Sequence, residues 1–318
     1  MDYLYLIIGL GILLLGAEFL VDSSVAIAKR AKVSSFVIGL TIVGMGTSSP
    51  ELCVSLSAAL QGSGDVAMGN IVGSNICNVF LILGLSVVIA PFAIQKNVVR
   101  RDIPFSILAA ILLPLLLYIP FSDSAERILS RFDGILLLIL FFAYIAFTVV
   151  MSRKQPSSDE ATSRLSGKPV MLLVFIALIS LGGLVGGGKL FLYAAENLAK
   201  AWGMSDAVIA ITVVAVGTSL PELITSVVAA LKKNSDLALG NVIGSNVFNI
   251  LFILGLSSTV KPLVTTGIRF EDFAVMIFAA LCTFLVAFTF RKRYFDRVEG
   301  ILFLLCYVGY TAYLLLRA

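Results

Sequence analysis

Long apolar stretches alternate with short polar clusters from one end of the chain to the other. Many of these stretches approach the roughly 20 residues that cross a bilayer as one helix. None shows the alternating segments, about ten residues long, that are typical of a membrane β-barrel. The pattern predicts an all-α polytopic membrane protein with ten transmembrane helices, at residues 3–22, 35–60, 66–90, 103–120, 132–151, 169–199, 206–231, 236–260, 272–290 and 297–316.

Composition agrees with this interpretation and narrows the chemistry. The 318 residues are 59% apolar and 13% charged, against about 25% charged in soluble domains, and the mean hydropathy is +1.04. The first apolar stretch lacks the basic start and the cleavage site of a signal peptide, so it is interpreted as the first membrane helix. The chain has no histidine, which argues against most hydrolytic chemistry. The four cysteines form no CxxC pair and are expected to be small buried hydrophobes: Cys53, Cys77, Cys282 and Cys306.

The distribution of basic residues predicts the orientation. If the N-terminus lies outside, the inner connectors carry sixteen Lys and Arg residues and the outer connectors six. Basic residues of membrane proteins concentrate on the cytoplasmic side, so both termini are expected on the outer side of the membrane. The expected location is the cell membrane, that is, a plasma or inner membrane. The polar connector 152–168 is interpreted as a cytoplasmic linker. Basic residues at helix ends explain the net charge of +4, so no nucleic-acid partner is expected.

An internal repeat divides the chain. Residues 37–92 align with 208–263 at an offset of 171 without a gap, and 28 of 56 positions are identical. The predicted organisation is a first five-helix repeat at 1–151, the linker, and a second five-helix repeat at 169–318. Because five is odd, the second repeat would enter the membrane inverted, as in secondary transporters whose site lies near the midplane between the repeats. The identities concentrate on polar residues within apolar helices, which favours function over packing alone.

The first repeated motif, GTSSPE, predicts a broken helix. Thr47 and Glu51 are four residues apart and so share a helix face. Pro50 donates no hydrogen bond and its ring clashes with the carbonyl of Gly46, so carbonyls around 44–47 would be free to face a cavity. The second copy repeats the motif with Gly217, Thr218, Pro221 and Glu222.

The second repeated motif forms a polar stripe. Asn70, Ser74 and Asn78 recur every four residues along one face. The stripe of the second copy consists of Asn241, Ser245 and Asn249. The simpler interpretation of this motif is that its asparagines form hydrogen bonds between helices: Asn70, Asn75, Asn241 and Asn246. The glycines of the GxxxG patterns in the same segments, Gly69 with Gly73 and Gly240 with Gly244, would allow close helix packing.

The two glutamates set the chemistry. An unpaired charged carboxylate at the bilayer centre costs roughly 2.5 kcal/mol or more, and neither motif contains Lys or Arg. The carboxylates are therefore protonated and hydrogen-bonded, or paired with a cation. Carboxylate, hydroxyl, amide and carbonyl oxygens suit hard cations; two glutamates would neutralise one Ca²⁺, and the same oxygens could hold Na⁺. One site used in turn by two ion species is the minimal exchanger.

Four further charged residues lie at positions that are equivalent between the two repeats. Glu18 and Lys189 occupy equivalent positions in the two repeats, and either an ion pair between them or a structural role would explain them. Asp65 and Asp236, also equivalent, precede apolar runs and are expected to cap helices at the membrane surface.

The motif pairs, GTSSPE with GSNICN and GTSLPE with GSNVFN, resemble the two alpha-repeats of sodium/calcium exchangers, in the cation/calcium exchanger superfamily, over nearly the whole chain. The length and short linker are similar to compact prokaryotic-type members. The Ca²⁺ ligands that the resemblance implies are Glu51, Glu222 and the backbone carbonyls of Thr47 and Thr218. Asn78 and Asn249 would line the central site. The implied flanking Na⁺ sites comprise Ser48, Ser74, Ser219, Ser245 and the carbonyls of Gly44 and Ala215.

The function implied is an electrogenic antiporter that exchanges several extracellular Na⁺ for one intracellular Ca²⁺ by alternating access, as helices 1 and 6 slide against the rest. It would need no cofactor, and would act as a monomer in the lipid bilayer. Many relatives, including potassium-dependent exchangers, carry aspartate where this chain has Asn249, so K⁺-independent exchange is expected.

Three alternatives stay open. A proton/calcium antiporter of the same superfamily usually carries asparagine where this chain has Thr47 and Thr218. A cation channel could be lined by the same oxygens. An intramembrane enzyme would be limited to a carboxylate mechanism, because histidine is absent.

Overall fold

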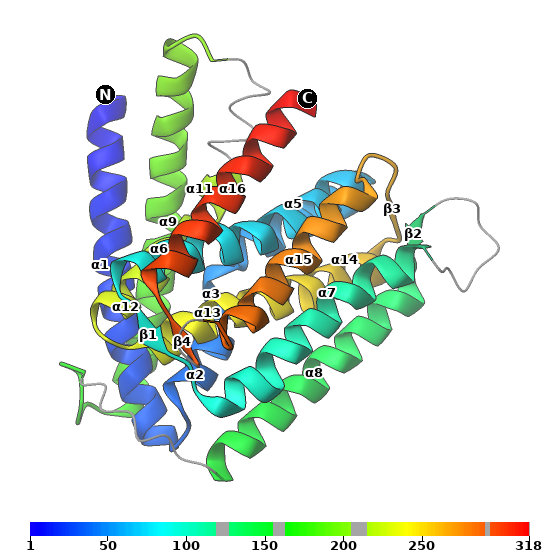
Figure 1. Cartoon of the computed structure of the whole chain (residues 1–318). Helices are drawn as coiled ribbons and strands as arrows, with labels where there is room; N and C mark the ends of the chain where they lie inside the picture. Colours follow the sequence, from blue (N-terminus) through cyan, green and yellow to red (C-terminus); the bar gives the residue numbers. More distant parts are fainter. Residues whose placement is uncertain (119–126, 155–162, 205–214, 290–292, 318) are drawn as a thin grey trace.

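The computed structural model describes residues 1–118, 127–154, 163–204, 215–289 and 293–317, and helices dominate it (Figure 1). In the first half the helices are α1 (Asp2–Ala31), α2 (Ser35–Ile38), η1 (Gly39–Val43), α3 (Gly44–Thr47), α4 (Ser49–Gln61), α5 (Gly64–Cys77), η2 (Asn78–Leu83), α6 (Gly84–Ile89), η3 (Val98–Asp102), α7 (Ile103–Tyr118) and α8 (Arg131–Lys154). In the second half they are α9 (Val170–Ala201), α11 (Ala215–Thr218), α12 (Leu220–Leu231), α13 (Ser235–Val247), η5 (Phe248–Leu254), α14 (Gly255–Val260), α15 (Phe270–Val286) and α16 (Arg297–Arg317).

By length and composition, seven helices in the described part of the chain could cross a membrane. The number is eight if the bent pair of Ser35–Thr47 and Ser49–Gln61 forms one span. The sequence pattern predicts ten. The difference arises because α15 has 17 residues and α12 has 12, and because residues 119–120, 206–214 and 290 of three predicted helices lie outside the described residues, as do residues 155–162 of the predicted linker. The protein is a predominantly helical, multi-pass chain.

Four two-residue strands are the departure from the all-α prediction. β1 (Phe92–Ala93) pairs antiparallel with β4 (Tyr294–Phe295), and β2 (Ile128–Leu129) pairs antiparallel with β3 (Leu263–Val264). Two residues are too few to show the alternation by which strands are recognised in a sequence. Each pair joins a connector of the first half to one of the second half.

Helices α1 and α9 lie side by side and stand apart in direction from the other long helices (Figure 1). Glycines allow their backbones to approach closely: a Cβ on Gly9 would lie 2.8 Å from the backbone nitrogen of Phe191 and 3.0 Å from the carbonyl oxygen of Gly187. α12 packs against α1. The chain's N- and C-terminal ends lie at the same end of the molecule in this view.

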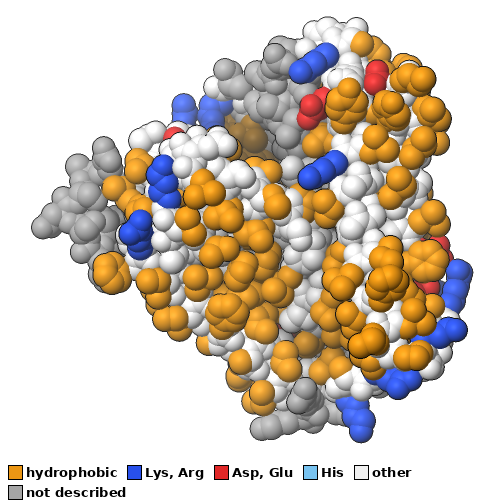
Figure 2. All heavy atoms as spheres, turned by 180° about the vertical axis from the view of Figure 1, so that it is seen from behind, with side chains coloured by type: hydrophobic (Ala, Val, Ile, Leu, Met, Phe, Trp, Pro, Cys, Tyr) orange, Lys and Arg blue, Asp and Glu red, His pale blue; other side chains and the backbone are white. Residues whose placement is uncertain are grey.

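The centre of the molecule is formed by the two helices that carry the polar stripes. In the span Ser235–Val260, 94% of the most apolar stretch is buried, and in Gly64–Ile89 it is 78%, against 17% in α16. Apolar side chains cover broad areas of the outer surface, and most Lys and Arg side chains lie toward its edges (Figure 2). This distribution suits a lipid-facing exterior.

The two aspartates predicted as helix caps have other partners. Asp65 accepts hydrogen bonds from the backbone nitrogens of Thr266 and Gly267, both at 2.9 Å. Asp236 accepts one from Gln95. Each aspartate therefore joins the first turn of its helix to a distant connector. The capping prediction is wrong, because the N-cap residues of these helices are Ser63 and Asn234.

Candidate ion-binding site

Both predicted helix breaks are present. α3 ends at Thr47 and α4 begins at Ser49, and the segments differ in direction by 50°. In the second half, α11 ends at Thr218 and α12 begins at Leu220. A proline lies in the first turn of each later helix, where it needs no hydrogen-bond partner but cannot continue the preceding helix.

The glutamates follow these breaks directly and the two halves hold each other's carboxylate. Glu51 and Glu222 lie in the first turns of α4 and α12, where the helix dipole favours negative charge, and each is 1% exposed. Ser48 Oγ donates to Glu222 Oε1 at 2.8 Å, and Ser219 Oγ donates to Glu51 Oε1 at 3.3 Å. The crossing bonds bring both repeated motifs into one buried site.

Two further asparagines of the polar stripes, Asn78 and Asn249, have side-chain amides that are oriented by hydrogen bonds to neighbouring asparagines. Asn78 begins the π-helical turn η2, and Asn249 lies in the corresponding turn η5; such turns often occur at functional sites. Asn78 Nδ2 donates to Asn246 Oδ1 at 3.0 Å, and Asn249 Nδ2 donates to Asn75 Oδ1 at 3.1 Å. Because the donors are used in this way, the amide oxygens remain available as acceptors.

Among the buried carboxylate and amide oxygens of the described residues, four have no hydrogen-bond partner: Glu51 Oε2, Glu222 Oε2, Asn78 Oδ1 and Asn249 Oδ1. Buried acceptors without a partner are costly, all the more so on carboxylates. Carboxylate and amide oxygens of this kind are ligands for the hard cations Ca²⁺ and Na⁺. The donor set therefore fits a cation as cargo.

Two outer asparagines of the stripes hold the glutamate helices in place. Asn70 Nδ2 donates to the backbone oxygen of Glu51 at 3.2 Å and to Ser55 Oγ at 2.9 Å. Asn241 Nδ2 makes the same two bonds in the second half, to the backbone oxygen of Glu222 at 3.3 Å and to Ser226 Oγ at 2.9 Å. The predicted hydrogen bonding between helices is confirmed for these asparagines. Ser55 and Ser226 were missed, although they are identical in the repeat.

The remaining predicted residues lie on two flanks. On one flank, Ser245 Oγ donates to the carbonyl oxygen of Gly44 at 3.3 Å, and Thr47 Oγ1 lies 3.2 Å from Asn241 Oδ1. On the other flank, Ser74 and Thr218 line one cavity of about 90 Å³ beside α16. The backbone of Ala215, the counterpart of Gly44, begins the short helix that ends at Thr218.

A larger cavity of about 550 Å³, here called the vestibule, leads to the helix breaks. Its lining includes Pro50, Cys53, Gln61, Lys189, Thr218 and Pro221. The prediction that Cys53 is buried is wrong, because the side chain is exposed in this cavity, and only Cys77 of the four is fully buried. Among the described residues that line it, the vestibule has no acidic side chain.

These features define a multi-pass membrane protein with a buried, oxygen-lined candidate site for a cation, to which two related halves contribute. Comparison with known proteins gives its family. The sodium/calcium exchanger protein family matches residues 1–150 and 172–316, and the chain belongs to it.

Individual relatives agree along the whole chain. The chain is 35% identical to a putative antiporter, CaxA, of Alkalimonas amylolytica over 96% of both chains. It is 34% identical to the sodium/calcium exchanger MaX1 of Methanosarcina acetivorans over 98% of both. The structure is similar to that of the sodium-calcium exchanger NCX_Mj soaked with Na⁺ and Ca²⁺, with a TM-score of 0.81, 35% identity and coverage of 98% of this chain and 97% of the other. Membership supports cation/Ca²⁺ exchange, the activity of a transporter and not of an enzyme.

Proposed function

We propose that the protein is a secondary active antiporter that exchanges extracellular Na⁺ for intracellular Ca²⁺ by alternating access. The observation that carries this proposal is the crossed pair of glutamates, each hydrogen-bonded by the opposite half and each with one unpartnered oxygen. Two carboxylates balance the charge of one Ca²⁺. Without a divalent ion, the same oxygens are available to Na⁺ or to protons.

The proposed Ca²⁺ ligands are Glu51, Glu222 and the carbonyls of Thr47 and Thr218, with Asn78 and Asn249 beside them. The proposed Na⁺ ligands are Ser48, Ser74, Ser219, Ser245 and the carbonyls of Gly44 and Ala215. The contact of Ser245 with the Gly44 carbonyl supports one flanking site. The cavity shared by Ser74 and Thr218 supports the other. Several Na⁺ for each Ca²⁺ would move net charge.

The proposed topology has ten transmembrane helices in two inverted repeats, 1–151 and 169–318, joined by the cytoplasmic linker 152–168, with both termini outside. The strand pairs support it. β1 and β4 lie in connectors that this topology places inside, and β2 and β3 lie in connectors that it places outside.

The proposed motion is a shift of α1 and α9 against the other helices. Close backbone contact between these two helices supports their moving as a pair. The vestibule reaches Gln61 at the end of α4 that the proposed topology places outside, which supports the interpretation of this conformation as outward-open.

Radiolabelled Ca²⁺ uptake into proteoliposomes under an outward Na⁺ gradient tests the function, with Glu51→Gln, Glu222→Gln and, as a control, the vestibule variant Ser57→Ala. We expect Na⁺-driven uptake that both glutamine variants abolish. Full activity in both variants would contradict the site. Uptake driven by a pH gradient without Na⁺ would indicate the proton antiporter instead. Ca²⁺ flux without coupled Na⁺ flux would indicate a channel.

A further inference from the structure

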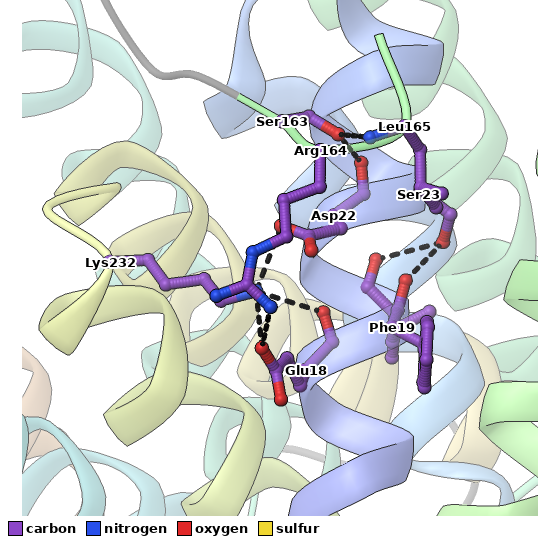
Figure 3. Close-up of polar contacts among 9 residues, drawn as sticks. Glu18, Phe19, Asp22, Ser23, Ser163, Arg164, Leu165 and Lys232 are labelled. Atoms are coloured by element: carbon purple, nitrogen blue, oxygen red, sulfur yellow. Dashed lines mark hydrogen bonds and ion pairs between the residues drawn. The ribbon is translucent and has the colours of Figure 1, made fainter. Parts of the chain in front are cut away.

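A cluster of charges joins α1 to the residue that follows α12. Lys232, just after α12, directs its Nζ to Asp22 Oδ1 at 2.8 Å, to Glu18 Oε1 at 3.7 Å and to the Glu18 carbonyl oxygen at 3.2 Å (Figure 3). Arg164 Nη1 also contacts Glu18 Oε1, at 2.8 Å. Glu18 thus pairs with these two residues and not with Lys189, so the suggested pair of Glu18 with Lys189 is not formed.

Burial distinguishes the contact of Lys232 with Asp22, which is strong, from the contact of Arg164 with Glu18, which is weak. The Asp22 side chain is 7% exposed and that of Lys232 is 24% exposed. The Arg164 side chain is 80% exposed, and exposed ion pairs contribute little. Separating a largely buried pair is costly unless water reaches both charges. The contact of Lys232 with α1 therefore opposes any opening between α1 and α12 at this end.

The internal repeat identifies the counterpart of this cluster at the other end. An offset of 171 places Lys189 at the position of Glu18, Gln61 at that of Lys232, and Tyr193 at that of Asp22. Lys189 and Gln61 both line the vestibule. At one end of the molecule, the residues at these positions form an ion pair and α1 is held against the end of α12. At the other end, the residues at the equivalent positions form no such pair and line the open vestibule.

We infer that Lys232, held between Asp22 and Glu18, is a latch that closes the inner route to the ion site and biases the exchanger toward the outward-open conformation. This inference rests on the proposed alternating access. When α1 shifts and the inner end opens, Lys232 and Glu18 come to line a cavity, as Gln61 and Lys189 do at the outer end. The outer end has no equivalent latch, because its positions carry a lysine and a neutral amide.

Labelling of Cys53 measures the balance between the two conformations, because this cysteine is exposed in the vestibule. The assay uses a variant in which the other three cysteines are replaced by alanine, so that Cys53 is its only cysteine. This variant is reconstituted in lipid nanodiscs without Na⁺ or Ca²⁺. N-ethylmaleimide, which is uncharged, then reaches both faces. If the outward form dominates by about ten to one, a tenfold shift halves its population. We expect Lys232→Gln to slow labelling about twofold or more.

Matched variants isolate the latch. Lys233→Gln removes the neighbouring exposed lysine, and Arg164→Gln removes the exposed partner of Glu18; both should label at the wild-type rate. The pair Lys189→Glu with Gln61→Lys, made together with Tyr193→Asp at the position of Asp22, moves the latch to the outer end and should also slow labelling. Lys189→Glu with Tyr193→Asp, without the new lysine, controls for the change of local charge. The transplanted pair gives a result even if Lys232→Gln does not fold.

Na⁺-driven Ca²⁺ uptake by the same variants separates the two proposals. No uptake by wild-type protein would overturn the proposed exchange. Wild-type uptake, together with unchanged Cys53 labelling in Lys232→Gln and in the transplanted pair, would overturn the latch alone. Slower labelling in either variant, with uptake retained by wild type, supports it.

Discussion

The unequal hydrogen bonds to the two glutamates predict unequal effects of removing the two serines. Ser48 donates to Glu222 at 2.8 Å, whereas Ser219 donates to Glu51 at 3.3 Å. Hydrogen bonds to charged groups contribute about 1.5–3 kcal/mol, and weaken as they lengthen. Ser48→Ala should therefore raise the Ca²⁺ concentration for half-maximal transport by about tenfold, equal to about 1.4 kcal/mol. Ser219→Ala should raise it less.

Ca²⁺–Ca²⁺ exchange in proteoliposomes without Na⁺ is the appropriate assay, because both serines are also proposed Na⁺ ligands. Ser49→Ala is the control: its hydroxyl bonds the carbonyl oxygen of Gly46 at 2.7 Å, within its own helix region, and does not contact either glutamate. An equal or larger effect of Ser219→Ala would refute the reasoning, because the ranking rests on the two distances alone.

Three further predictions concern packing, positioning and ion selectivity. Gly244→Ala should prevent folding, since its Cβ would lie 2.4 Å from the Leu40 carbonyl oxygen, while Gly73→Ala, at the equivalent position, meets no atom within 4 Å and should give the wild-type elution profile in size-exclusion chromatography. Asn241→Ala removes three hydrogen bonds at a fully buried position and should lower the thermal unfolding temperature more than Asn70→Ala, which removes two at a half-buried one; equal shifts would contradict this. Exchange currents should be the same with and without K⁺, and a strict K⁺ requirement would contradict the interpretation of Asn249.

The repeat carried most of what could be predicted about the site. Identical motifs at a constant offset indicated that Glu51 and Glu222 play equivalent parts, and the structure brings their motifs together through Ser48 and Ser219. The breaks at Pro50 and Pro221 followed from proline chemistry alone. Local rules of this kind act within one or two helix turns, which is why they could be read from the residues.

Contacts between distant segments could not be predicted in the same way. Which serine meets which glutamate depends on how the two halves pack. Exposure of Cys53 depends on the vestibule, which is formed by helices from both halves. One partner of Glu18 is Lys232, 214 residues away, and nothing in the local sequence of either residue indicates this contact.

The strand pairs have a mechanical consequence. Each joins the two halves by backbone hydrogen bonds, β1 with β4 and β2 with β3, and neither includes α1 or α9. In the part of the chain that the structure describes, no backbone hydrogen bond links α1 or α9 to another of the long helices. The strand pairs thus tie the two halves together outside α1 and α9. In the proposed motion, the α1–α9 pair would shift without breaking any backbone hydrogen bond between long helices of the described residues.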